Sequence, residues 1–112
     1  MRIVSKEEFL KLPEGTMYSD YKPVIFSGLA IKGETIYDNK GEPIDFLYQD
    51  LIGNVDYEDT GGFFDKANSG SFELDFDCFE RDGFYDDSEQ YAIYTPEEVN
   101  QFINTVQRLT SK

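Results

Sequence analysis

The sequence predicts an α+β fold with a mostly antiparallel sheet of about four to six strands. A short N-terminal helix and a longer C-terminal helix are expected, and the longer helix should pack on one face of the sheet. Three observations support this prediction. Capped helical segments stand at both ends, apolar and polar residues alternate between them, and the links are short and turn-like. The 112 residues are the length of one domain, residues 1–112.

Both predicted helices begin at capping sequences. Ser5 and Glu8 form an S-x-x-E capping box that predicts a helix over about 6–12. Thr95, followed by a proline and a capping-box glutamate, predicts a helix over about 96–110. The second helix carries an apolar stripe at helical spacing, made of Val99, Phe102, Ile103, Val106 and Leu109.

The strands of the first half are predicted from residue type and alternation. Residues 24–31 are rich in apolar residues and predict a strand that is broken or bulged near Gly28. Lys-Gly-Glu at 32–34 predicts a turn, and the sequence TIYD at 35–38 begins another strand. Residues 44–52 alternate, with Ile44, Phe46 and Tyr48 on one face and Asp45, Leu47 and Gln49 on the other.

Two more strands are predicted in the second half. Residues 71–79 alternate, with Phe72, Leu74, Phe76 and Cys78 on one face and Glu73, Asp75 and Asp77 on the other. Residues 89–95 form the last strand. The glycine-rich segment 56–70 is irregular, with a short helix around 63–67. Because Cys78 lies on the apolar face of the predicted strand 71–79, it is expected to be buried and chemically quiet.

The charge is strongly negative and lies in the middle of the chain. The protein has 23 acids against 10 bases, a net charge of −13, and no histidine. Residues 1–33 carry five bases and four acids, residues 34–100 three bases and nineteen acids, and residues 101–112 two bases and no acid. Direct binding to DNA, RNA or an anionic membrane is disfavoured, because those partners need clustered Lys and Arg. The favoured partner is a basic protein surface.

The acidic row on the predicted strand 71–79 suggests that the basic surface of the partner is one that binds nucleic acid. Side chains on one face of a strand repeat about every 6.6–6.8 Å, whereas a DNA strand carries one phosphate per about 3.4 Å. The row would thus reach about half the charge density of a nucleic-acid strand. A solvated strand face without a partner is the alternative. The candidate partner-binding residues are Glu73, Asp75, Asp77, Asp82, Asp86, Asp87, Glu89, Asp56, Glu58, Asp59, Phe84 and Tyr85.

Metal-ligating and catalytic patterns are incomplete. An EF-hand loop that starts at Asp56 reaches Ala67 where the bidentate Glu should stand, and a start at Asp75 fails earlier. Zinc would lack enough of its usual ligands, because the chain has no His and a single Cys. The commonest general base is absent, no carboxylate pair is singled out, and no phosphate-binding loop is present. We expect a protein that is not an enzyme and has no cofactor, while a weak Ca²⁺ or Mg²⁺ site stays open.

The sequence also predicts a compartment. Cys78 is the single cysteine, so no intrachain disulfide can form, as is typical of the reducing cytoplasm. The N-terminal residues lack the apolar stretch of a signal peptide, and no run is long enough for a membrane span. A cytoplasmic location is expected.

The stretches EEFLKLPEGTMYSDY, YQDLI and FERDGFYDD resemble small acidic proteins encoded in bacteriophage genomes. This resemblance implies the host bacterial cytoplasm as the setting and carries no catalytic residue with it. Phage proteins of this size and charge include inhibitors of host defence, among them anti-CRISPR and anti-restriction proteins that imitate nucleic acid. The helical DNA mimics differ from the mixed fold predicted for this chain.

These observations predict a non-catalytic inhibitory binding protein. Its acidic surface would occupy a basic nucleic-acid-binding site on a host nuclease or defence complex by nucleic-acid mimicry. An immunity-type protein that neutralises a toxin nuclease is an alternative, which would use the same attraction between acidic and basic surfaces with another partner. A structural or assembly protein that self-associates through the last helix or a strand edge is a third hypothesis, and a carboxylate-based hydrolase is a fourth.

Overall fold

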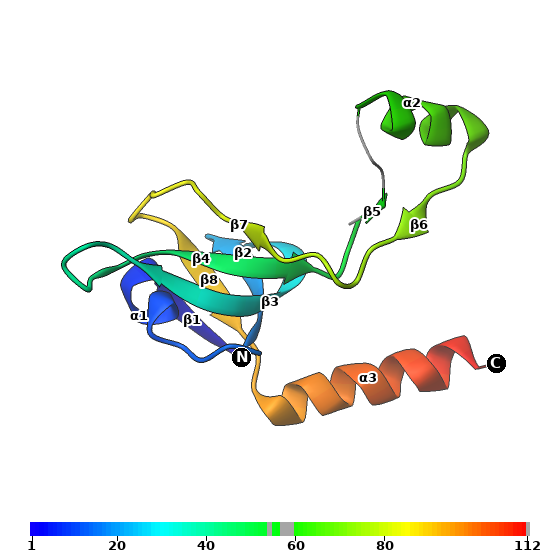
Figure 1. Ribbon diagram of the computed structural model, residues 1–112. Helices are drawn as coiled ribbons and strands as arrows, with labels where there is room; N and C mark the ends of the chain where they lie inside the picture. The colour runs from blue at the N-terminus through cyan, green and yellow to red at the C-terminus, as the bar shows by residue number, and fades with distance from the viewer. Residues whose placement is uncertain (54, 57–59, 112) are drawn as a thin grey trace.

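The computed structural model describes residues 1–53, 55–56 and 60–111. In these residues the main sheet has six antiparallel strands in the order β1-β8-β2-β3-β4-β7, and β5 and β6 pair separately. The elements are β1 (Arg2–Ser5), α1 (Lys6–Leu10), β2 (Met17–Lys22), β3 (Ile25–Tyr37), β4 (Pro43–Asp50), β5 (Val55–Asp56), α2 (Thr60–Ser69), β6 (Glu73–Leu74), β7 (Glu80–Arg81), β8 (Gln90–Ile93) and α3 (Pro96–Thr110). The expected α+β fold is confirmed (Figure 1). Among the described helices, none has the length and apolar character needed to cross a membrane.

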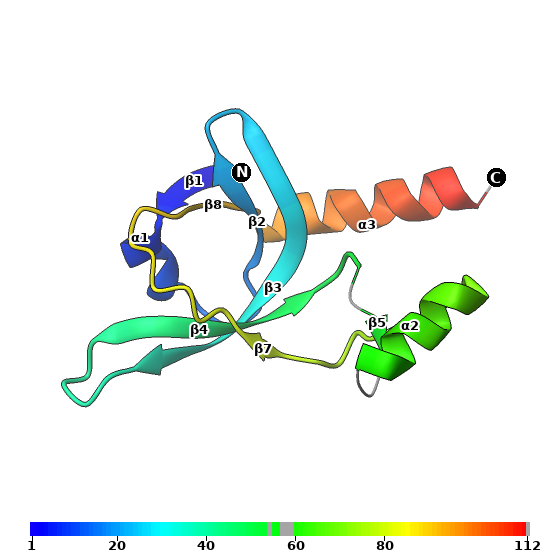
Figure 2. The same cartoon turned by 90° about the horizontal axis from the view of Figure 1, so that it is seen from above.

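The main sheet is curled, and α1 fills one end of its interior. Figure 2 shows the strands wrapped around this interior, with α1 against β1, β4 and β8. Phe9 of α1 is fully buried at the centre of an aromatic cluster. Its ring stacks on Tyr91 with centroids 4.1 Å apart and meets Tyr18 and Phe46 edge-on at 4.7 and 4.9 Å. The core is completed by Val4, Leu10, Ala30 and Ile93.

The start and end of α1, the helix that carries Phe9, are fixed by two hydrogen bonds. The Ser5 hydroxyl accepts a hydrogen bond from the backbone N–H of Glu8 at 3.2 Å, so α1 begins directly at the end of β1. The helix lasts only to Leu10, two residues short of the expected end. The Leu10 carbonyl, left free at the end of α1, accepts from the Thr35 hydroxyl at 2.8 Å and so ties the helix to β3.

Strand β3 differs from the expectation of two strands separated by a turn. It runs unbroken from Ile25 to Tyr37, with a shift in its pairing to β4 between Lys32 and Thr35. The buried Lys32 ammonium donates to the Thr35 hydroxyl at 2.6 Å, which stabilises the irregularity. A Cβ on Gly33 would lie 2.8 Å from the Phe79 ring. Glycine is therefore needed at this position to leave space for the ring, and it does not mark a turn. The bulge predicted near Gly28 is confirmed by the register shift opposite β2.

The expected strand 71–79 is mostly not a strand. Only Glu73–Leu74 pair, with β5, and the chain is irregular from 75 to 79. The buried side chain of Gln49 on β4 takes the place of a strand partner there. Its Oε1 accepts from the N–H of Cys78 at 2.5 Å, and its Nε2 donates to the carbonyl of Asp75 at 3.0 Å. The expected regular row of Glu73, Asp75 and Asp77 therefore does not form.

The segment β5-α2-β6 is an arm that leaves the curled sheet beyond β4 (Figures 1 and 2). It contains the helix expected near 63–67, which is longer than predicted and spans Thr60–Ser69. Large apolar side chains on and after the arm are exposed: Phe64, Leu74, Phe76 and Phe79.

Helix α3 has the predicted bounds and cap but not the expected position. The Thr95 hydroxyl accepts from the N–H of Glu98 at 3.1 Å, and the Glu98 carboxylate accepts from the N–H of Thr95 at 3.0 Å. Instead of lying on a sheet face, α3 extends away from the sheet, and none of its residues is buried (Figure 1). The physical reason is that α1 already fills the apolar interior of the curled sheet.

Candidate functional site: an acidic cleft in the curled sheet

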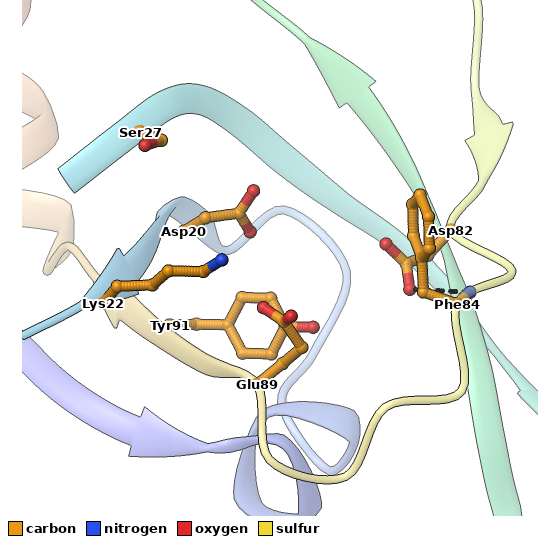
Figure 3. A pocket seen from close by; sticks show the side chains of 7 residues that line it. All are labelled: Asp20, Lys22, Ser27, Asp82, Phe84, Glu89 and Tyr91. Carbon is orange, nitrogen blue, oxygen red and sulfur yellow. Dashed lines mark hydrogen bonds between the residues drawn. The ribbon is translucent and has the colours of Figure 1, made fainter. Parts of the chain in front are cut away.

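The end of the sheet interior that α1 does not fill opens to solvent as a hollow of about 310 Å³. Figure 3 shows its lining from β2, β3, β8 and the segment between β7 and β8. A second hollow of about 190 Å³ shares part of this lining and adds residues of β4. We name the two together the acidic cleft. Its carboxylates are Asp20, Asp50, Asp82 and Glu89, its rings are Tyr18, Tyr48 and Tyr91, and its rim carries Lys22, Ser27 and Phe84.

Strand alternation places a carboxylate beyond each tyrosine ring. On β2, Tyr18 is buried against the core and Asp20, two residues later, faces the cleft. On β4, Tyr48 and Asp50 repeat this spacing. Residues two apart on a strand share a face, so the inner surface changes from aromatic near α1 to acidic at the opening.

The cleft wall between β7 and β8 is held by Asp45, which is fully buried on the outer face of β4. Its carboxylate accepts from Arg81 Nε at 2.5 Å and from the N–H of Gly83 at 3.1 Å. Burial raises the pKa of this carboxyl, but the Arg81 and backbone hydrogen bonds outweigh burial and hold the pKa below its ordinary value. Asp82 and Phe84 alternate along the chain with Arg81 and Gly83. Their position in the acidic cleft therefore depends on the hydrogen bonds that Arg81 and Gly83 donate to Asp45.

A buried lysine lies beneath the same wall. Lys6 of α1 is almost fully buried, and its ammonium is 3.7 Å from the Asp82 carboxylate. Among the described residues this ammonium has no hydrogen-bond partner. Lys6 therefore offsets part of the charge of Asp82 from below.

The remaining carboxylates of the acidic cleft are only partly compensated, by Lys22 on its rim. Burial, together with the charges of Glu89, Asp82 and Asp50, raises the pKa of Asp20, although Lys22 opposes the shift. In Figure 3 the Lys22 side chain extends toward Asp20. Burial and Glu80 raise the pKa of Asp50, and burial with the nearby carboxylates raises the pKa of Tyr48 to about 12. The cleft thus holds negative charge at an energetic cost.

This arrangement is chemically suited to a cation. Carboxylates accept strong hydrogen bonds from guanidinium or ammonium groups, and tyrosine faces attract cations. A phosphate or another anion would be repelled. In the described ranges, no three His, Cys, Asp or Glu side chains are grouped so that they could hold a metal ion.

The structure brings three of the predicted site residues into the acidic cleft. Asp82 and Glu89 supply carboxylates, and Phe84 stands at the rim with 79% of its surface exposed. The Asp86 carboxylate instead accepts from Ser88 within its loop. Asp87 faces a different hollow, beside α1. Tyr85 is exposed, and its hydroxyl accepts from the Arg81 guanidinium.

The other described candidate residues lie on the arm or directly after it and not in the cleft. Asp56 is in β5 and Glu73 in β6, and Asp75 and Asp77 follow β6. Glu58 and Asp59 lie outside the described residues. The described candidate acids are therefore divided between the cleft, the arm with the residues after it, and the loop that carries Asp86 and Asp87.

Sequence reasoning missed the acids contributed by the first half of the chain. Asp20 stands in the nearly neutral segment 1–33, and Asp50 stands in a segment whose clearest pattern is apolar alternation, so neither was predicted as a site residue. A usable signal was present. Tyr18-x-Asp20, Tyr48-x-Asp50 and Glu89-x-Tyr91 all pair a ring with an acid two residues away, which puts both on one strand face.

Cys78 is partly exposed, which corrects the expectation of burial. Burial and the carboxylates of Asp75 and Glu80 raise the pKa of its thiol. We expect the native protein to react with neutral iodoacetamide at pH 7.5 more slowly than a free cysteine peptide, because the thiolate is the reactive form. The rate should rise on unfolding in urea. A native rate equal to that of the peptide would show that the carboxylates do not act on the thiol.

Comparison with protein-family models, curated proteins and solved structures gave no match for this chain.

Proposed function

We propose that this protein is a non-catalytic inhibitory binding protein whose acidic cleft and surrounding acidic surface occupy a basic nucleic-acid-binding site on another protein. The observation that carries the proposal is the excess of negative charge in the cleft, four carboxylates against Lys22 on the rim and Lys6 beneath it, and burial with the facing carboxylates raises the pKa of Asp20. A cation from a partner would remove this cost, and a site built to bind phosphates offers such cations. A host nuclease or defence complex is a partner class with that chemistry.

The contact would combine charge with an aromatic rim. An arginine side chain can enter the cleft and pair with Asp20 or Glu89. Phe84 would pack on the partner surface beside the entry point, since exposed aromatic residues ringed by charge are typical interface anchors. Charge would accelerate association, and the rim would contribute to specificity.

The double substitution Asp20→Asn/Glu89→Gln tests the cleft. Neither carboxylate has a hydrogen bond to a described residue that the substitution would break, so folding should be preserved. We expect affinity for a fluorescent oligo-arginine peptide to fall by about ten-fold or more, largely through a slower association rate. The loss should shrink as the salt concentration rises. Stopped-flow and equilibrium anisotropy at two salt concentrations measure both quantities.

The matched control is Glu73→Gln/Asp77→Asn on and after β6, which also removes two negative charges. It should weaken peptide binding far less. Equal losses in both variants would mean that only net charge matters and would remove the cleft as the site. The mimicry is tested by competition: a short DNA duplex should displace the protein from a purified basic DNA-binding protein, and simultaneous binding of both would contradict it.

A further inference from the structure

The apolar stripe of α3 is an exposed face on a well-formed helix. Phe102 is 48% exposed, Ile103 45%, Val106 43% and Leu109 53%. The helix has a complete capping box, and Figures 1 and 2 show it extending away from the sheet. A contiguous apolar row on a projecting helix exposes hydrophobic surface to water without any gain, unless another surface covers it.

We propose that α3 pairs in antiparallel orientation with α3 of a second copy of this chain. Val99, Phe102, Val106 and Leu109 are spaced by three, four and three residues, which is the spacing of a two-helix seam. In an antiparallel pair, Val99 faces Leu109 of the second copy and Phe102 faces its Val106. The arrangement has two-fold symmetry, so both stripes are covered by one contact.

Charge complementarity selects a second copy and the antiparallel orientation. The first turn of α3 carries Glu97 and Glu98, of which Glu98 already pairs with the N-terminal ammonium at 2.5 Å, whereas the last turn carries Arg108. Residues 101–112 contain two bases and no acid, so the projecting end is the least acidic part of the chain. Antiparallel pairing brings the basic end of each helix to the acidic first turn of the other. Parallel pairing would place like charges together at both ends.

The body of the protein also leaves room for the end of a second helix. A groove lies between the loop 13–17 and the first turn of α3, lined by Pro13, Met17 and Val99. An antiparallel partner places its Leu109 beside Val99, at this groove. The apolar end of one helix would thus reach the body of the other copy.

The expected contact is small. A helix of 15 residues is about 22 Å long, and two such helices packed along one face bury on the order of 1,000 Å² in total. That area is at the lower limit for a stable interface. Dimerisation should therefore have a dissociation constant in about the micromolar range. Higher salt should not weaken dimerisation, because each chain has a net charge of −13 and the repulsion that salt screens is larger than the attraction between the helix ends.

Sedimentation velocity of the full chain over a wide range of protein concentration tests the proposal. The sedimentation coefficient should rise from that of a monomer to that of a dimer. Val106→Glu places a charge in the seam and should weaken dimerisation by about ten-fold or more. Asn104→Glu adds the same charge on the opposite face of α3 and should leave dimerisation unchanged. Circular dichroism confirms that both variants keep their helix content.

Disulfide formation in a Cys78→Ser background tests the orientation. Proteins carrying Val99→Cys and Leu109→Cys should cross-link with each other when mixed, and neither should cross-link alone. A chain that stays monomeric at all concentrations, or a dimer insensitive to Val106→Glu, overturns the proposal. Cross-linking of the Val99→Cys protein with itself overturns the antiparallel arrangement.

Discussion

Replacing Phe9 with alanine is expected to lower the free energy of unfolding by about 4 kcal/mol, the largest effect of any substitution considered. Phe9 is fully buried and contacts the rings of Tyr91, Tyr18 and Phe46. Its removal leaves a cavity between α1 and the sheet that a five-residue helix cannot close. For a domain of this size the melting temperature should fall by about 15–20 °C. Urea unfolding followed by circular dichroism measures the change.

The same substitution should disturb the acidic cleft, because Tyr18 and Tyr91 form both the wall of the core and the floor of the cleft. Phe9→Leu keeps most of the volume and should cost only about 1–2 kcal/mol, so it remains measurable if the alanine variant does not fold. Leu12→Ala, at the partly buried edge of the cluster, is the control and should cost about 1 kcal/mol. A Phe9→Ala cost no larger than that of the control would show that α1 is not the centre of the core.

Replacing Asp45 with asparagine is expected to cost about 2–3 kcal/mol. The buried carboxylate accepts from Arg81 and from the N–H of Gly83, and an amide would turn an N–H toward one of these donors. The segment that carries Asp82 and Phe84 should loosen, so binding to the cleft should weaken even though Asp45 itself lies outside it. Asp45 is in this sense a positioning residue. Urea unfolding and peptide binding measure the two effects.

The effect of Asp45→Asn should depend on pH. The folded pKa of Asp45 lies below its ordinary value of about 3.9. Its contribution to stability is therefore complete above that value and is lost as the pH falls through the lowered folded pKa. The difference in unfolding free energy between the wild type and the variant should be constant near neutral pH. It should shrink toward zero in acid. Asp87→Asn removes the same charge at an exposed position and should change stability by less than about 0.5 kcal/mol.

Local signals in the sequence were sufficient for the helix starts and for strands β4 and β8, whereas β1, β2, β5 and β7 were not predicted. The caps at Ser5 and Thr95 involve residues three apart, so the information for them lies within one turn. The alternation along β4 placed Phe46 and Tyr48 on the inner face correctly. The bulge near Gly28 was likewise readable from a single glycine in an apolar segment.

Long-range contacts decided the features that were predicted wrongly. The alternation of 71–79 looked like a strand, but Gln49 takes up its backbone groups and turns the segment into an irregular one. Gly33 looked like a turn residue, but it makes room for the ring of Phe79, which lies more than forty residues away in sequence. No local pattern contains such information, because the partner residues are far apart in the chain.

The sequence by itself determined that the protein is acidic, aromatic and α+β, with capped helices at both ends. Only the tertiary structure decided where the charge is concentrated. The curl of the sheet brings Asp20, Asp82 and Glu89 from distant segments into one cleft. It also leaves α3 outside, because the single apolar interior of a chain this short is already filled by α1. Composition sets how many charged and apolar side chains the protein has, whereas the packing of the sheet sets which of these side chains face a partner.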